Sequence, residues 1–190
     1  VLTTGTPVFG GDGSLAAYRV TGGSIAIEGA GLDATGSDRL DLIARAVAVN
    51  AGLWAKQLNV VAGANQVGHT DLAATPIAGA GPAPAVAIDV ALLGGMYADK
   101  IRLVGTEAGV GVASAGRLAA QAGDLDIDAA GRITLRGTTS ATGNLTVRSD
   151  GAIDQSGTLY AQGNASLTGA ALMPTSAANR MAMNSALTTL

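Results

Sequence analysis

The hydrophobic pattern between residues 123 and 168 is short and repeats itself. The stretch GDLDIDAAGRITLRGTTSAT is followed directly by GNLTVRSDGAIDQSGTLYAQ, and a third GN begins at Gly163. Within each copy, apolar and polar residues alternate over a few positions and then stop at a turn. Alternation is typical of β-strands, because successive side chains point to opposite faces. Each copy therefore predicts three short strands separated by turns.

Glycines set the period of this repeat. Gly123, Gly143 and Gly163 recur at one constant interval, and two further glycine columns keep the same interval. We expect these glycines at corners of the chain, where positive φ is least costly for glycine. Asp124, Asn144 and Asn164 follow them and predict a stack of turn-favouring side chains. NLT at 144 and NAS at 164 also match glycosylation acceptors, but the turn role accounts for both asparagines.

A three-strand unit this short cannot bury its own apolar face, so copies must stack. One copy per coil brings each residue beside its equivalent in the next copy and pairs each strand in parallel with its counterpart, about 4.8 Å away. The prediction is an all-β parallel β-helix, with coils of about 20 residues and three short strands per coil. The inward columns are expected to be Leu125, Leu145 and Ala165; Ile127, Val147 and Leu167; and Ile133, Ile153 and Met173.

The upstream chain follows the same pattern less strictly. DKIRLVGTEAGVGVASAGRLAAQAG predicts a slightly longer coil, and GGSIAIEGAG, DRLDLIARAVAVNAG and KQLNVVAGANQV predict further strands. Residues 37–50 would also suit a helix capped by Ser37, although the alternation of Leu40 with Leu42 and of Val47 with Val49 favours strands.

Two segments interrupt the pattern. Residues 63–87 hold three prolines and many alanines and glycines, which predicts a surface excursion or an extra hairpin outside the coils. After Ala170 the register decays, so that residues 174–190 suit an irregular last coil, a short helix or a frayed end. A β-helix fragment exposes unpaired strands at its ends, so we expect some form of cap.

The composition limits which residue types can form the core and which classes of partner are possible. Hydrophobic residues make up 48% of the chain and aromatic residues 3%, so the core is expected to consist of Ala, Val, Leu and Ile. The net charge is −3 and basic residues are scattered, which argues against nucleic acid and anionic membrane as partners. Without cysteine there are no disulfides or thiolate sites. No apolar run reaches the roughly 20 residues of a membrane span, and the chain starts at Val1 without a signal-peptide pattern, as expected of an excised piece.

Candidate chemistry is sparse. His69 and its neighbour Asp71 lack a nucleophile in a suitable context, which favours a loop histidine. Asp124, Asp126 and Asp128 offer carboxylates to a cation, yet alternation spreads them over a solvated face. We therefore expect no catalytic residues, no cofactor and no metal site.

Two further groups admit a ligand-binding interpretation. The densest charged cluster could serve a carbohydrate-acting β-helix enzyme, although residues 33–39 fit the decoration of a corner better; it consists of Glu28, Asp33, Asp38, Arg39, Asp41 and Arg45. Trp54 could form a ligand platform, but wedging between strands or covering a corner is favoured, and Tyr97 is expected to be a corner anchor.

Several phrases resemble the filamentous-haemagglutinin-type exoproteins of two-partner secretion, a group that includes adhesins and contact-dependent growth-inhibition toxins. They are VLTTGTP, GGSIAIEGAGLDA, DLIARAVAVNAGLWAKQLNVVAGANQV and ALLGGMYADKIRLVGTEAGVGV, and with the repeats they cover the chain to about residue 170. The resemblance implies a right-handed β-helix. It places the carboxy-terminal part of a secretion-type (haemagglutination activity) domain at residues 1–100 and the start of a filamentous repeat shaft at residues 101–190. The NPNG and NPNL motifs of that family's secretion domain are absent, as is any effector region.

The resemblance implies a non-enzymatic role. The chain would be a structural segment of a large secreted or cell-surface exoprotein, a rigid stalk for adhesion or for delivery of a distal toxin. Its implied partners are an outer-membrane transporter, through the full secretion domain, and a target-cell receptor, through distal regions, with no membrane insertion by this segment. The alternative is a β-helix carbohydrate-active enzyme, a polysaccharide lyase or glycosidase, which should show long loops framing a cleft.

Overall fold

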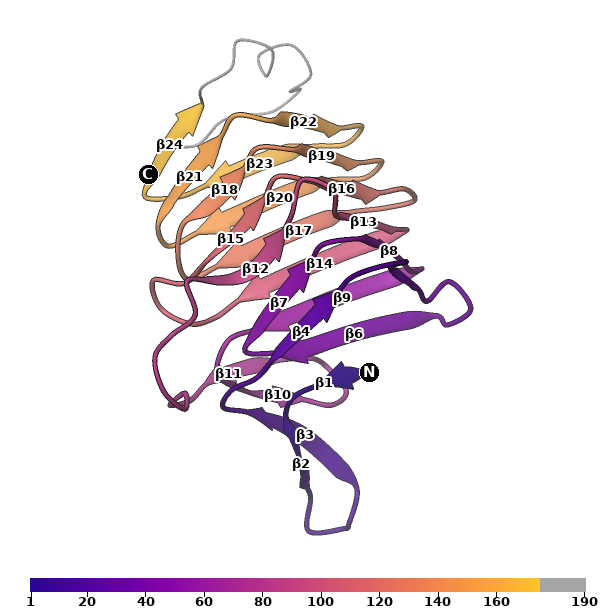
Figure 1. The fold of residues 1–190 in the computed structure, drawn as a ribbon, viewed down its shortest axis with the longest axis vertical. Coiled ribbons are helices and arrows are strands. Elements are labelled where there is room, and N and C mark those ends of the chain that lie inside the picture. Colours follow the sequence, from indigo (N-terminus) through magenta and orange to yellow (C-terminus); the bar gives the residue numbers. More distant parts are fainter. Residues whose placement is uncertain (175–190) are drawn as a thin grey trace.

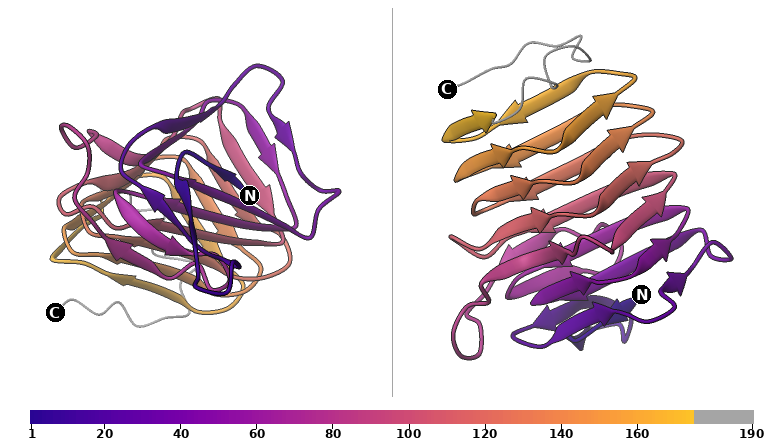
Figure 2. Two further views of the ribbon diagram at one scale, coloured as in Figure 1. Left: turned by 90° about the horizontal axis from the view of Figure 1, so that it is seen from below. Right: turned by 45° about the horizontal axis from the view of Figure 1, so that its top comes forward.

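The computed structural model describes residues 1–174, which wind into a stack of coils (Figure 1). Each complete coil contributes one strand to each of three parallel sheets. Figure 2 shows the coils stacked along the long axis of the molecule, with the amino-terminal coils at one end. The predicted all-β, right-handed parallel β-helix with three strands per coil is confirmed. The predictions for residues 175–190 lie outside the described residues.

The three sheets carry the strands in an order that repeats with every coil. Sheet 1 consists of β1 (Leu2–Thr3), β6 (Arg39–Ala44), β9 (Gln57–Ala62), β14 (Lys100–Gly105), β17 (Leu125–Ala129), β20 (Leu145–Ser149) and β23 (Ala165–Thr168). Sheet 2 consists of β4 (Ser24–Ile27), β7 (Ala46–Val49), β12 (Val86–Val90), β15 (Gly111–Ser114), β18 (Ile133–Leu135), β21 (Ala152–Gln155) and β24 (Ala171–Pro174). Sheet 3 consists of β5 (Leu32–Asp33), β8 (Gly52–Trp54), β13 (Gly95–Ala98), β16 (Arg117–Ala120), β19 (Thr138–Ala141) and β22 (Thr158–Ala161).

Residues 37–50 form strands, so the helical alternative is wrong. They supply β6 and β7, which lie in sheets 1 and 2 of the same coil. Leu40 and Leu42 point into the coil interior together with Val47 and Val49, and all four are buried. A helix would place residues i and i+2 on different faces, whereas the interior needs them on one face.

Two of the predicted core columns are confirmed residue by residue. Leu125 pairs with Leu145, which pairs with Ala165, and the column of Ile127, Val147 and Leu167 keeps the same register. The side chains are buried in one continuous core of small and branched residues. The upstream coil is longer, as predicted, since the step from β14 to its partner β17 covers more sequence than the step from β17 to β20.

The third predicted column is wrong at its last member. Ile133 pairs with Ile153, but Ile153 pairs with Leu172, and Met173 lies opposite Asp154. The turn that leads into β24 is one residue shorter than the turn before β21, which shortens this step of the repeat. A shift of one residue moves a side chain to the other face of the strand. Met173 is accordingly 48% exposed.

The repeat glycines serve a purpose other than the one predicted. Gly137 and Gly157 stand at coil corners, yet neither has positive φ. A Cβ added at either would lie less than 3.0 Å from the backbone of the preceding coil, at the carbonyl oxygens of Gly116 and Gly137 respectively. Glycine is needed here because adjacent coils approach too closely for a side chain, and the expectation of positive φ is wrong.

The stack of turn side chains is confirmed. The Asp124 Oδ1 accepts a hydrogen bond from the Asn144 backbone N–H at 2.7 Å, and the Asn144 Oδ1 accepts one from the Asn164 N–H at 3.0 Å. Each turn side chain thus fixes the backbone of the next coil. The asparagines of both NxS/T matches belong to this stack.

Two excursions leave the coils and form a fourth sheet, which is antiparallel. Residues 63–87 contain the predicted extra hairpin, made of β10 (Asn65–Gly68) and β11 (Ala74–Pro76). A second hairpin, not predicted from the sequence, consists of β2 (Thr6–Phe9) and β3 (Leu15–Val20). The sheet order is β11, β10, β3, β2, and Figure 1 shows this sheet at the amino-terminal end of the stack.

The fourth sheet covers a second, smaller apolar core. Ile43 and Val61 lie on neighbouring strands of sheet 1 and project away from the coil interior. The fourth sheet buries both side chains. Val20, Val67 and Tyr18 pack on them from the hairpins. The fourth sheet therefore shields apolar surface that the coil interior cannot accommodate.

Candidate functional site

His69, the histidine considered as a catalytic candidate, packs against Tyr18. His69 lies in the turn after β10, with its Nδ1 3.3 Å from the Tyr18 hydroxyl and its ring edge-on to that of Tyr18. The Asp71 carboxylate accepts a hydrogen bond from the backbone N–H of Ala73 instead of orienting the imidazole. The loop interpretation of His69 is confirmed, since the residue lies in the turn that follows β10.

The predicted charged cluster is divided among separate contacts. Asp38 pairs with Lys56 at 2.9 Å on the surface, and Asp33 accepts hydrogen bonds from the N–H and hydroxyl of Thr35. These bonds lower the pKa of Asp33, as the Lys56 ammonium lowers that of Asp38. Residues 33–39 occupy the corner between β5 and β6, so the corner interpretation is confirmed.

Glu28, Arg39 and Asp41, three further members of that cluster, have partners in their own or the neighbouring coil. Glu28 accepts a hydrogen bond from the Asn50 amide at 3.3 Å. Asp41, only 1% exposed, accepts a hydrogen bond from the Asn59 amide at 2.8 Å and forms an ion pair with Arg39 at 2.9 Å. The structure therefore does not bring these carboxylates together around a common site.

The aspartate run is distributed as its alternation predicted. Asp126 and Asp128 are exposed on the outer face of β17, while Asp124 belongs to the turn stack. Asp128 lies directly opposite Arg148 on the next coil. In residues 1–174, no group of three or more His, Cys, Asp or Glu side chains is arranged to hold a metal ion.

Trp54 and Tyr97 form a stack on the outer face of sheet 3. Their ring centroids are 5.8 Å apart, and the planes of the two rings are nearly parallel, with an angle of 13° between them. Each ring lies over a glycine two residues earlier, Gly52 or Gly95, where a Cβ would come within 3.0 Å of the ring. Tyr97 lies within β13 and not at a corner, so its predicted corner role is wrong.

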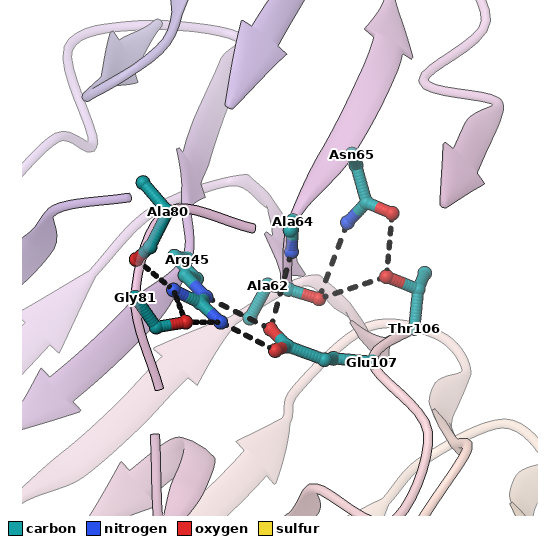
Figure 3. A network of polar contacts seen from close by, with 8 residues as sticks. All are labelled: Arg45, Ala62, Ala64, Asn65, Ala80, Gly81, Thr106 and Glu107. Carbon is teal, nitrogen blue, oxygen red and sulfur yellow. Dashed lines mark hydrogen bonds and ion pairs between the residues drawn. The ribbon is translucent and has the colours of Figure 1, made fainter. Parts of the chain in front are cut away.

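A polar network that sequence reasoning missed joins residues of three consecutive coils (Figure 3). Arg45 lies at the corner between β6 and β7, and Glu107 follows β14, two coils further along the stack. The guanidinium donates to both carboxylate oxygens, from Nη2 at 2.7 Å and from Nε at 3.1 Å. Arg45 Nη1 also donates to the Ala80 carbonyl at 2.6 Å, and Glu107 accepts from the Ala64 N–H at 3.3 Å.

This network fastens both ends of the excursion that contains β10 and β11. Ala64 stands at its start and Ala80 near its end, and the ion pair reaches across the third coil to hold both. Beside it, the Thr106 hydroxyl donates to the amide oxygen of the fully buried Asn65 at 2.6 Å (Figure 3). The hydrogen bonds from Arg45 lower the pKa of Glu107, and the carboxylate raises that of the guanidinium. No local pattern links residues so far apart in the sequence, so only the fold could reveal this pair.

No helix in the described part of the chain is long and apolar enough to span a membrane. Two family models match the chain. A model described as "TPS secretion domain" matches residues 1–135, and one described as "Haemagglutinin repeat" matches residues 120–173.

Individual relatives agree with these matches. The chain is 59% identical over 140 residues, 74% of its length, to tRNA nuclease CdiA-2 of Burkholderia pseudomallei, and 51% identical over 148 residues, 77% of its length, to Toxin CdiA of Yersinia pestis. It spans 4% of the length of each. The crystal structure of a filamentous hemagglutinin secretion domain matches with a TM-score of 0.67 and 33% identity, over 91% of this chain and 58% of that one. This chain belongs to the family of TPS secretion domains, and its β-helix continues into haemagglutinin repeats.

Proposed function

We propose that this chain is a structural segment of a large secreted or cell-surface bacterial exoprotein, exported through an outer-membrane two-partner-secretion transporter. In this proposal the β-helix is a rigid stalk that carries a distal adhesive or toxic region away from the cell. The names of the CdiA relatives, which include a tRNA nuclease and a toxin, support a distal toxin in the parent protein. The target-cell receptor would be bound by that distal region.

The observation that carries the proposal is the continuity of the stack. Sheet 1 runs from β1 to β23 without a break, through the overlap of the two family matches at residues 120–135. Every coil adds about 4.8 Å of length and buries its apolar residues against its neighbours, so the stack behaves as one stiff rod. Length and stiffness are the properties that a stalk needs.

We further propose the junction between secretion-type domain and shaft near Lys100. Both hairpin excursions, and the two four-residue turns between sheets 2 and 3, precede this residue. From β15 to β24 the turns have two to four residues, and the step from β17 to β20 equals the step from β20 to β23. The described residues from β15 to β24 thus have the regularity expected of the start of a repeat shaft, which we propose to extend over residues 101–190.

The carbohydrate-acting alternative gains no support. Its carboxylates are engaged in separate ion pairs and turns. The excursion that could frame a cleft, residues 63–87, instead contributes β10 and β11 to a packed sheet.

The stalk proposal can be tested by deleting either one complete coil, which keeps the register of the stack, or half a coil, which breaks it. In the full exoprotein, removal of residues 125–144 deletes one complete coil and leaves every column intact, whereas removal of residues 125–134 deletes half a coil and misplaces the next strand. We expect the first variant to be exported and displayed at the surface and the second to be retained. Equal export of both would contradict a stacked stalk.

Export and toxicity are tested separately. Residues 1–190 behind a periplasmic signal, co-expressed with the parent's transporter, should not reach the medium unless the family's amino-terminal extension with its asparagine motifs is restored. The same residues expressed in the cytoplasm should leave growth unchanged. Growth arrest would reveal an activity of the segment itself, and efficient release would show that residues 1–190 suffice for export.

A further inference from the structure

The turn between sheets 2 and 3 is longer in the third coil than in the coils on either side of it, and the first coil, where residues 28–31 join β4 to β5, also has a long turn. Between sheets 2 and 3, the register leaves two residues in the second coil and two in each of the fourth, fifth and sixth. The third coil has four, Ala91 to Gly94, because Val90 pairs with Ser114 while Gly95 pairs with Arg117. The two additional residues correspond to Leu92 and Leu93.

The insertion places both leucines in solvent. Leu92 is 77% exposed and Leu93 is 89% exposed, more than any other large hydrophobic side chain of the described residues. Neither belongs to a core cluster in the described part of the chain. Exposed apolar side chains that gather next to a groove are a typical feature of interaction sites.

These leucines stand at one end of a groove of about 770 Å³ that crosses the turns of the following coils. It is lined by a column of stacked turn glycines, where no side chain fits between coils: Gly94 and Gly116, which are buried, and Gly137 and Gly157, which are partly exposed. The ring of Tyr97 lines it as well. The groove therefore runs along the axis of the rod.

The charge of the groove is of one sign. Arg117 and Arg136 line it and are exposed, and neither forms an ion pair within residues 1–174. Thr138, Ser156 and Thr158 add hydroxyl groups, and none of the described lining residues is acidic. In a chain of net charge −3, this is a cationic strip beside an apolar pair.

A second groove, on the outer face of sheet 1, shows the contrast. It has about 330 Å³, and its Arg102 and Arg148 lie opposite Asp126 and Asp128 on neighbouring strands. Its charges compensate each other, whereas those of the glycine groove are left for a partner.

We propose that the glycine groove binds an extended peptide segment of a partner protein, with acidic residues placed on Arg117 and Arg136 and an apolar residue on Leu92 and Leu93. Three coil steps of about 4.8 Å match roughly four to five residues of an extended chain at about 3.3 Å each. Guanidinium groups bind carboxylates through paired, charge-assisted hydrogen bonds. A peptide fits better than an acidic polysaccharide, because the Tyr97 ring already stacks on Trp54 and the apolar contact comes from aliphatic side chains.

The experiment is a selection from a phage library of random linear peptides against the folded chain, followed by fluorescence anisotropy with the enriched peptides. We expect enrichment of sequences that combine Asp or Glu with Leu, Ile or Val. Arg117→Gln and Arg136→Gln should each weaken binding about tenfold or more, and Leu92→Ser with Leu93→Ser should do the same. Binding should also weaken as salt concentration rises.

Arg102→Gln and Arg148→Gln, each made singly, are the matched controls, since each removes one positive charge from the other groove. All these side chains are exposed, so the variants should melt as the wild type does. Peptides enriched without acidic residues, or bound equally by the Arg117→Gln variant, would overturn the proposal. So would polygalacturonate binding that depends on both arginines but not on the leucines, since the groove would then be a glycan site.

Discussion

The guanidinium of Arg45 and the carboxylate of Glu107 form a two-bond ion pair between coils that are far apart in the sequence, with distances of 2.7 and 3.1 Å. The side chains are 8% and 17% exposed, so the pair is largely removed from solvent. Because it also holds Ala64 and Ala80, it couples three coils to the hairpin excursion. Loss of one partner would leave the other charge without compensation in a confined site.

Substitution of this pair should give a pH-dependent loss of stability. The Arg45 guanidinium lowers the pKa of Glu107 below its ordinary value of 4.5. A carboxylate with a depressed folded-state pKa contributes stability above its unfolded pKa and loses it as pH falls through the folded value. The difference in melting temperature between wild type and Glu107→Gln should therefore be largest near neutral pH and shrink below about pH 4.5. A difference that does not change between neutral and strongly acidic pH would contradict this role.

The same substitution should cost much more stability on the inward face of β20 than on its outward face. Leu145→Lys places an ammonium in the column between Leu125 and Ala165, and should cost about 3 kcal/mol or more through lost burial and desolvation. Thr146→Lys puts that group on the outer face, beside Asp126, and should change stability by less than about 0.5 kcal/mol. Chemical denaturation of both variants measures the difference. Similar costs would contradict the register of the coils.

The turn glycines should be intolerant of a methyl group although their φ angles allow one. Gly137→Ala should destabilise the fold by about 1–3 kcal/mol, because the Cβ would overlap the carbonyls of Gly116 and Ala115. Gly36→Ala is the control, since nothing lies within 4 Å of its Cβ and its φ is not positive, and it should be neutral or slightly stabilising. If the two variants melt alike, close approach of the coils does not explain the glycine column.

Two buried serines should behave differently on conversion to alanine. The Ser114 Oγ has no hydrogen-bond partner among the described residues, so Ser114→Ala should stabilise the fold by about 1 kcal/mol. The Ser149 Oγ donates to the Gly131 carbonyl at 2.8 Å and accepts from the Gly151 N–H at 3.0 Å. Ser149→Ala should therefore destabilise by about 1–2 kcal/mol. Equal shifts in thermal melts would argue against this assignment of partners.

The sequence by itself determined the coil, because the information is local and repeated. A constant period with alternating apolar positions defines three strands per coil, and stacking of equal units then fixes columns such as Leu125 with Leu145. The same repetition indicated the turn stack of Asp124 and Asn144. It failed where a turn changed length by one residue, at Met173, because register depends on the number of residues in every turn.

Tertiary structure alone decided what lies outside the coils. The union of two distant hairpins into one antiparallel sheet depends on the excursions emerging close together from the first and third coils, which no local pattern encodes. The pairing of Arg45 with Glu107 and the groove beside Leu92 and Leu93 also arise from stacking, which brings together residues of different coils. The reason for the repeat glycines is likewise tertiary: the limit on their side chains is the backbone of the adjacent coil and not their own φ.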